Sequence, residues 1–259
     1  MKFSIITCTK NSASFLAENI ASVKAQTFTD YEQVFVDGFS DDGTWETIER
    51  YREANPDKVR AVQTEPKGIS NAMNRGIREA KGEFLIHLHS DDSFYDDKVL
   101  ADVADFLDKN PQLDWIYGQA NTIREDGSSI LVYPNKPCLH FQKSTSPIGR
   151  YLMKILRFVP HQAVFIKKSI FEKFGYFDET LSTEMDPDLW FRIRNKTNWS
   201  FFHRIICNYR MTDTAASSSP KNKQRNAENI RTVQKRYLNP VEYFLVGLLN
   251  RVRNLRAKK

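Results

Sequence analysis

Residues 3–38, FSIITCTKNSASFLAENIASVKAQTFTDYEQVFVDG, read as a strand, a helix and a second strand. The apolar run at residues 3–7 is typical of a short buried strand, and a second such run fills residues 31–38. Between them, apolar residues recur at helical spacing from residue 11 to residue 28, after polar residues that can cap a helix. This arrangement favours two parallel strands joined by a crossover helix.

The same alternation continues outward to about residue 112. We expect further strands at residues 59–65 and 83–89, and further helices at residues 40–54, 69–82 and 95–111. Strands that alternate with helices in this way predict an α/β fold, with a Rossmann-like, mostly parallel sheet flanked by helices.

The pattern becomes mixed from residue 113 onward. We expect a hairpin around Asp126 and Gly127 within residues 114–134, a strand and short helix within 160–179, a helix within 183–198 and a strand at 200–211. Residues 135–158 are basic and irregular. We therefore treat residues 1–225 as one domain with two halves, 1–112 and 113–225, followed by a basic helical tail at 226–259.

The composition excludes several classes of protein. The chain has 259 residues, a net charge of +6 and three well-separated cysteines, Cys8, Cys138 and Cys207. No CxxC motif occurs, so the sequence indicates neither a disulfide framework nor a zinc site. We see no signal peptide and no run of the ~20 apolar residues that a membrane span needs. We expect a cytoplasmic protein with an anionic partner, which charge alone leaves open among phosphates, nucleic acid and an acidic membrane.

Polar clusters follow three of the expected strands. They lie at residues 7–11, 37–42 and 90–92. In open α/β sheets, ligands bind beyond the carboxyl ends of the strands, so these clusters predict a shared binding rim. Asp91 and Asp92 are adjacent acids that repel each other, and we expect them to meet a positive charge.

Four ordered blocks of the sequence resemble glycosyltransferase family 2, whose members have the GT-A fold. The blocks begin SIITCTKN, EPKGISNAMNRG, VPHQAVF and MDPDLWF, and the resemblance covers roughly residues 3–217. It implies inverting transfer of a sugar from a nucleotide donor, by default a UDP-sugar. It also implies a divalent metal, Mg²⁺ or Mn²⁺, and a glycan or lipid-linked acceptor in surface polysaccharide biosynthesis, such as lipopolysaccharide.

The resemblance gives the two adjacent acids a role. Asp92 would ligate the metal held by the donor diphosphate, and Asp91 would support the ribose or the metal's waters. Hard cations prefer carboxylate and phosphate oxygens, which agrees with that role. The alternative is that Asp91 or Ser93 caps the following helix.

Further positions match the donor side of the family pattern: Thr9, Asn11, Asp37, Glu65, Gly68 and Asn74. By resemblance, they surround the nucleotide. Asn74 can equally be a buried structural amide, and we favour helix capping for Asp41 and Asp42. Relatives commonly carry an acid between the positions of Pro66 and Lys67, which this chain lacks, and another where this chain has Asn71, so the identity of the donor stays open.

On the acceptor side, Asp186 matches the general base of the family, which deprotonates the acceptor hydroxyl. Asp188 is the alternative base, and Glu184 is a weaker one. Pro187 suits the first turn of a helix, so Asp186 can instead be a pure cap. His161 matches a histidine at the acceptor edge, or it is a structural histidine. His89 stands where relatives often have Asp or Asn.

The tail predicts a basic amphipathic helix within residues 239–259. Its apolar stripe comprises Val241, Phe244, Leu245, Leu248, Val252 and Leu255. Such a helix can lie on an anionic membrane, here the inner face of the cell membrane, or pack on its own domain or on a second subunit.

Two other functions compete with the transferase. A nucleotidyltransferase on a similar sheet would carry a glycine-rich loop after the first strand, and TCTKNSAS has no glycine. A nucleic-acid-binding module would interleave bases with aromatic residues, which this chain does not do, so we expect no nucleic-acid partner.

Overall fold

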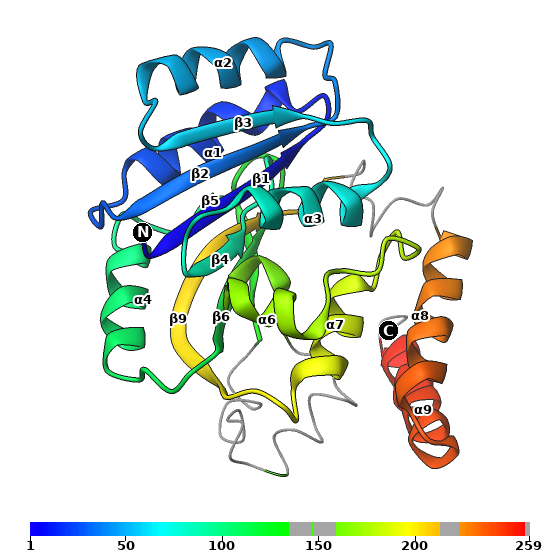
Figure 1. Ribbon diagram of the computed structural model, residues 1–259. Coiled ribbons are helices and arrows are strands. Elements are labelled where there is room, and N and C mark those ends of the chain that lie inside the picture. Colours follow the sequence, from blue (N-terminus) through cyan, green and yellow to red (C-terminus); the bar gives the residue numbers. More distant parts are fainter. Residues whose placement is uncertain (135–146, 148–158, 213–222, 257–259) are drawn as a thin grey trace.

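The computed structural model describes residues 1–134, 147, 159–212 and 223–256 (Figure 1). The strands in this part of the chain are β1 (Phe3–Thr9), β2 (Tyr31–Asp37), β3 (Val59–Gln63), β4 (Phe84–His87), β5 (Ser93–Phe94), β6 (Trp115–Ile123), β7 (Ser129–Tyr133), β8 (Val164–Lys167) and β9 (Trp199–Arg210). The helices are α1 (Ala13–Lys24), α2 (Thr44–Ala54), α3 (Ile69–Glu79), α4 (Val99–Asp108), η2 (His161–Ala163), α6 (Lys168–Phe174), α7 (Met185–Ile193), α8 (Lys223–Tyr237) and α9 (Pro240–Arg256).

The described strands form one sheet in the order β3-β2-β1-β4-β8-β6-β9-β5, with β7 paired to β6. The first four strands in this order are parallel. Strand β8 then runs antiparallel to both β4 and β6, and β9 runs parallel to β6. The predicted mostly parallel sheet, the mixed second half and the hairpin at residues 114–134 are confirmed.

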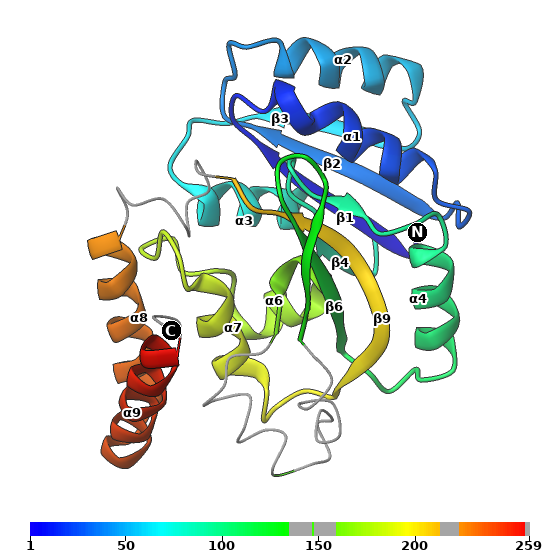
Figure 2. The same cartoon turned by 180° about the vertical axis from the view of Figure 1, so that it is seen from behind.

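Helices cover both faces of the sheet. Alternate residues of a strand point to opposite faces, and β1 shows this clearly. Ile6 packs in a cluster with residues of α3, α6 and α7, whereas Ile5 packs in a second cluster with residues of α1 and α4. Figures 1 and 2 show α3, α6 and α7 on one side and α1 and α2 on the other. Near-continuous apolar strands are the consequence of this double burial.

The two last helices lie outside the sheet layers. In both views α8 and α9 run side by side next to α7, on the side away from α4 (Figures 1 and 2). Val233 of α8 joins the cluster around α7, and Val246 of α9 is buried. The described part of the tail is therefore a pair of helices, of which α8 is described from Lys223 onward.

Some expectations fall on residues that the structure does not describe. They are Cys138, most of the basic segment at 135–158 and the stretch from residue 213 to residue 222. Cys8 and Cys207 are buried free thiols. None of the described helices is both long enough and apolar enough to cross a membrane.

Candidate active site

The carboxyl ends of β1, β2 and β4 lie together. Strand β1 pairs with β2 on one side and with β4 on the other, and Thr9 is the register partner of Asp37. The loop after β4 reaches the loop after β1, where the Ser90 hydroxyl donates to the Ser12 hydroxyl at 2.9 Å. The structure thus brings the three polar clusters to one rim, as the sequence predicts.

Asp37 organises the first part of this rim. Its Oδ1 accepts from the hydroxyls of Thr9 at 2.8 Å and Ser40 at 2.6 Å. Its Oδ2 accepts from the Ser40 amide at 2.9 Å and from Gln63 Nε2 at 3.2 Å. The Asp37 side chain is fully buried, and its carboxylate accepts four hydrogen bonds from protein groups. These bonds hold the loop after β2 against the end of β1.

Asn11 and Asp42 shape the neighbouring turns. Asn11 has a left-handed backbone, with φ at 50°, and its side-chain oxygen accepts from the Asp41 amide at 3.1 Å. Asp42 accepts from the amides of Ala13 and Thr44, which begin α1 and α2, and from the Thr44 hydroxyl. The Thr44 hydroxyl bond is the main cause that lowers the pKa of Asp42. This position matches the capping role that we favoured for Asp42.

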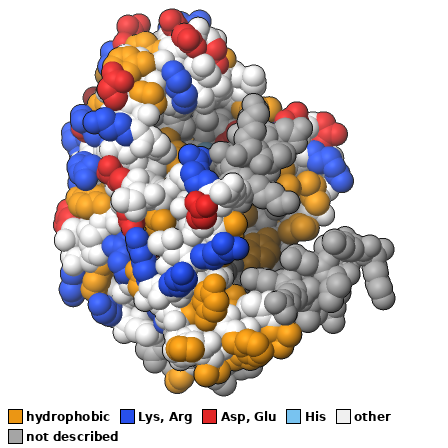
Figure 3. Space-filling view, turned by 90° about the vertical axis from the view of Figure 1, so that its right-hand side faces the viewer, with side chains coloured by type: hydrophobic (Ala, Val, Ile, Leu, Met, Phe, Trp, Pro, Cys, Tyr) orange, Lys and Arg blue, Asp and Glu red, His pale blue; other side chains and the backbone are white. Residues whose placement is uncertain are grey.

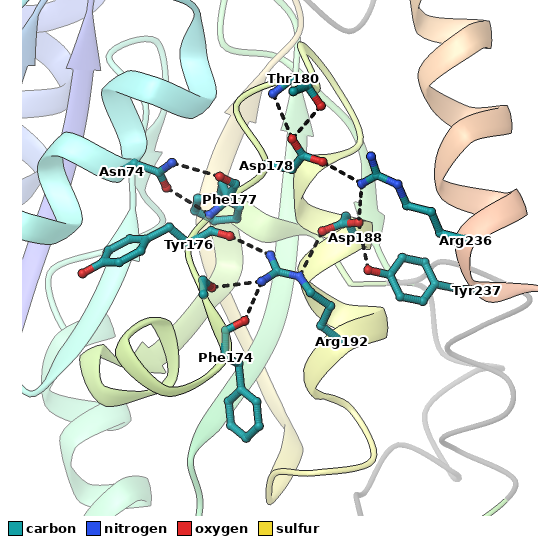
Figure 4. Close-up of polar contacts among 11 residues, drawn as sticks. Asn74, Phe174, Tyr176, Phe177, Asp178, Thr180, Asp188, Arg192, Arg236 and Tyr237 are labelled. Atoms are coloured by element: carbon teal, nitrogen blue, oxygen red, sulfur yellow. Dashed lines mark hydrogen bonds and ion pairs between the residues drawn. The ribbon is translucent and has the colours of Figure 1, made fainter.

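The predicted donor residues of the second block, Glu65, Gly68 and Asn74, differ in exposure. Glu65 and Gly68 are exposed, and Gly68 precedes α3 with φ at 100°. Asn74 is buried, and its amide bonds both the N–H and the carbonyl of Phe177 (Figure 4). Its Nδ2 also donates to the Glu179 carboxylate. Asn74 therefore ties α3 to the loop before α7, which is the structural alternative stated for it.

The adjacent acids Asp91 and Asp92 differ in solvent exposure. Asp92 is 1% exposed, its Oδ1 accepts from the Arg210 amide at 2.9 Å, and its Oδ2 is enclosed without a hydrogen-bond partner. Burial, and then the charge of Asp91, raise the pKa of Asp92 well above its ordinary value. Asp91 keeps part of its surface open, and burial raises its pKa as well.

Arg210 supplies a positive charge from within the chain. Its Nε donates to the Asp91 carbonyl at 3.2 Å, and one terminal nitrogen forms a 2.5 Å ion pair with Glu18. The other terminal nitrogen donates to the carbonyls of Arg124 and Glu125 in the β6–β7 turn. The sequence analysis missed this residue, although the last strand ends on it.

Asp186 lies near the start of α7, in the second half of the domain. The helix begins after Glu184, which has a left-handed backbone with φ at 71°. The Asp186 carboxylate is 21% exposed, and its Oδ2 lies 3.6 Å from Nδ1 of His161. Nε2 of His161 lies 2.8 Å from Nε2 of His89, which precedes Asp91 by two residues. A chain of contacts therefore links the loop that carries the acidic pair to Asp186.

Asp188 lies two residues after Asp186 in α7, but its carboxylate bonds neighbouring protein side chains. It accepts from Arg192 Nε at 3.0 Å, from Arg236 at 3.1 Å and from the Tyr237 hydroxyl at 2.9 Å (Figure 4). The last two come from α8, and the Asp188 side chain is buried. This geometry favours Asp186 over Asp188 as a group that can meet a substrate.

The acidic pair suits a hard cation in charge and in chemistry. The described residues contain no group of three or more His, Cys, Asp or Glu side chains that could hold a metal by themselves. Asp91 and the unpartnered Oδ2 of Asp92 supply carboxylate oxygens, and a divalent cation commonly completes its shell with substrate phosphates and water. The pair therefore fits a cation that arrives with a phosphorylated ligand.

Comparison with known proteins identifies the family of this chain. The profile of the family described as "Glycosyl transferase family 2" matches residues 4–175. A protein of Rickettsia felis named "Uncharacterized glycosyltransferase" is 32% identical over 223 residues, which are 85% of this chain but 36% of that protein. A "PGL/p-HBAD biosynthesis glycosyltransferase" of Mycobacterium bovis is 29% identical over 215 residues, covering 80% of this chain and 76% of that protein.

Solved structures of TarS from S. aureus share the fold. Residues 1–349 of TarS in complex with UDP-GlcNAc superimpose with a TM-score of 0.73 and 22% identity, over 92% of this chain and 67% of that one. The complex with UDP gives a TM-score of 0.67 and 21% identity, over 94% of this chain and 68% of that one. The predicted GT-A architecture is confirmed by this likeness.

Proposed function

Because the chain belongs to glycosyltransferase family 2, we propose that it moves a sugar from a UDP-sugar to a hydroxyl of a glycan or lipid-linked saccharide, with inversion. One observation carries the proposal. The partly open Asp91 lies in the loop after β4, the partly open Asp186 lies at the start of α7, and contacts of His89 with His161 and of His161 with Asp186 link the two segments. In this proposal Asp91 serves the donor diphosphate and Asp186 serves the acceptor hydroxyl.

The fold likeness supports the choice of nucleotide. TarS structures that share this architecture were solved with UDP and with UDP-GlcNAc. The rim residues Thr9, Asn11 and Asp37 lie at the carboxyl ends of β1 and β2, where ligands of open α/β sheets bind. In our proposal, Thr9 and Asn11 line the nucleotide site and Asp37 holds their loops in place.

We assign the metal contact to Asp91 first. The sequence analysis gave that role to Asp92, but Asp92 is enclosed, and one of its oxygens already bonds the Arg210 amide. Asp91 and Asp92 together would hold Mg²⁺ or Mn²⁺, and such an ion would offset the charge that develops on the departing diphosphate. Arg210 steadies the backbone on which both acids stand.

Asp186 is the general base in this proposal. The acceptor oxygen forms a bond to the anomeric carbon, its proton passes to the Asp186 carboxylate, and the bond from that carbon to the diphosphate oxygen breaks. The bonding pair leaves with the nucleoside diphosphate. A positioned carboxylate of this kind contributes roughly 10²–10⁴-fold to rate. Attack from the side opposite the leaving group inverts the anomeric centre.

The test is calorimetric titration of the full chain with UDP, GDP and dTDP, each with and without Mn²⁺. We expect UDP to bind only with the metal, and Asp91→Asn to lose that binding. Asp41→Asn is the matched control, because Asp41 is exposed and outside the proposed metal contact. A folded protein that binds none of the three nucleotides would overturn the proposal.

We also propose that α9 lies on the inner face of the cell membrane. Residues 223–259 contain ten Lys and Arg against two Glu, so the remaining 222 residues carry no excess of positive charge. Val241, Phe244 and Leu248 are exposed on one stripe of α9. The face of the molecule that carries α8 and α9 shows hydrophobic side chains gathered along its lower edge with Lys and Arg above them (Figure 3).

A further inference from the structure

Two histidines from distant parts of the chain contact each other, and one of them lies next to Asp186. His89 follows β4, and His161 begins the short helix η2 before β8. Their Nε2 atoms lie 2.8 Å apart, and the rings are tilted by 72° to each other. On its other side, His161 turns Nδ1 toward Asp186 Oδ2 at 3.6 Å. His161 is thus the middle member of a row of three polar groups.

The distance between the two Nε2 atoms requires that they share one proton. Two nitrogen lone pairs, or two N–H groups, would repel at 2.8 Å, so one ring donates and the other accepts. Because the described residues gather no third ligand, a metal between the rings is not supported. The remaining question is which ring carries the proton.

The carboxylate of Asp186 decides the direction. An ionised Asp186 repels a lone pair on Nδ1 of His161 and attracts an N–H there. A neutral His161 with its proton on Nδ1 has a lone pair on Nε2, which must then accept from Nε2–H of His89. His89 therefore carries its proton on Nε2 and donates it to Nε2 of His161 across the 2.8 Å contact.

We propose that His161 is a positioning residue for the base, held as the Nδ1–H tautomer by a hydrogen bond from His89. It fixes Oδ2 of Asp186 and leaves Oδ1 to take the proton of the acceptor hydroxyl. The 3.6 Å separation is slightly longer than a hydrogen bond, and such contacts often tighten when substrate binds. The inference rests on the proposed role of Asp186, and it adds to that role a residue pair that sets the geometry of the base.

The first measurement is ¹⁵N NMR of the histidine side chains in the full chain at pH 7.5, without ligand. The chain has five histidines, and His89→Asn and His161→Asn identify the two signals. We expect His161 to carry its proton on Nδ1 and His89 on Nε2. A His161 signal protonated on Nε2 alone would overturn the assignment, whether or not the protein transfers sugars.

The second measurement separates positioning from structure by kinetics. An Asn amide reproduces the Nδ1–H of histidine, and a Gln amide reproduces the Nε2 position. With hydrolysis of UDP-GlcNAc in the presence of Mn²⁺ as the probe, we expect His161→Asn to keep kcat within about fivefold and His161→Gln to lose about 10²-fold, at an unchanged KM. The exposed His203→Asn is the control and should behave as wild type.

Equal losses in His161→Asn and His161→Gln, or a rise in KM without a change in kcat, would contradict the positioning role. If the wild-type chain itself releases no UDP, the proposed function fails instead. In that case the NMR tautomers still decide whether the His89–His161–Asp186 row exists as inferred.

Discussion

Arg210 is the residue on which the acidic loop depends. Its guanidinium is almost completely buried and bonds the carbonyls of Asp91, Arg124 and Glu125 as well as Glu18. It also stacks over the Phe15 ring at 4.7 Å. One side chain therefore joins α1, the β6–β7 turn and the loop after β4. The sequence raised the question of what charge meets Asp91 and Asp92, and within the protein the answer is Arg210.

We expect Arg210→Ala to lower the free energy of unfolding by about 3 kcal/mol, because it leaves buried carbonyl groups without donors. Urea unfolding followed by circular dichroism measures this. Arg204→Ala is the control, since Arg204 pairs with Asp96 and Asp102 at partly exposed positions and should cost about 1 kcal/mol or less. Equal costs for the two variants would show that the Arg210 network adds no more than a surface ion pair.

Asp92 predicts a pH dependence of stability. Its pKa is raised in the folded protein, chiefly by burial, so the unfolded chain gives up this proton first as pH rises. The stability that Asp92 contributes is therefore complete below its unfolded pKa and is lost as pH rises through the folded pKa. We expect the free energy of unfolding of the wild type, measured in EDTA and relative to that of Asp92→Asn, to rise by on the order of 1 kcal/mol as the pH is lowered from 7.5 to 4.5. A difference that stays constant, or grows with pH, would mean that Asp92 is ionised in the fold.

At the scale of elements, α7 carries the two carboxylates named from the sequence as the general base, Asp186, and its alternative, Asp188. Asp186 faces His161, whereas Asp188 faces Arg192 and the two α8 residues Arg236 and Tyr237. The two acids lie two residues apart, which places them about 200° apart around a helix. One helix therefore presents one acid to the site and the other to its packing partner.

Asp186→Asn and Asp188→Asn should have opposite effects on activity and on stability. Asp186→Asn should abolish UDP release from UDP-GlcNAc, by at least 10²-fold, and leave thermal stability and UDP binding unchanged. Asp188→Asn should destabilise the protein by about 3 kcal/mol, because the buried Asp188 side chain loses the charge that pairs with Arg192 and Arg236, and keep most of the turnover per folded molecule. Near-normal turnover in Asp186→Asn would show that the base assignment is wrong.

The helices and strands show how much of the fold the sequence pattern predicts. Apolar periodicity is a local signal, and it found β1 to β4, the β6–β7 hairpin and α7 within a few residues. It did not find β5, whose two residues form a strand only because β9 lies beside them. Asn74 and Asp188 show the same limit for the site. Their roles depend on Phe177 and Arg236, which no local pattern brings near. The acidic pair was recognisable from its place after a strand, but the burial of Asp92 was not.

At the scale of the whole molecule, the charge is divided between two regions. The GT-A domain carries nearly balanced charge, and the basic excess belongs to the α8–α9 pair and the residues after it. Helix α7 lies between the sheet and this pair (Figures 1 and 2). Asp188 links α7 to α8 directly (Figure 4). A lipid-linked acceptor would therefore meet Asp186 close to the part of the protein that we place on the membrane.

Sedimentation with vesicles tests this arrangement. We expect the full chain to bind vesicles of 30% phosphatidylglycerol in phosphatidylcholine and to bind pure phosphatidylcholine much less, because basic residues near an anionic surface each contribute about 1 kcal/mol. Val241→Glu with Phe244→Glu should reduce the bound fraction at least about tenfold, since Phe244 is 70% exposed and loses its apolar contact. Ile130→Glu, at an exposed apolar position on β7, is the control. If light scattering instead shows a dimer that the double variant dissociates, with vesicle binding unaffected, the α9 stripe is a contact between two copies of the chain and the membrane proposal is wrong.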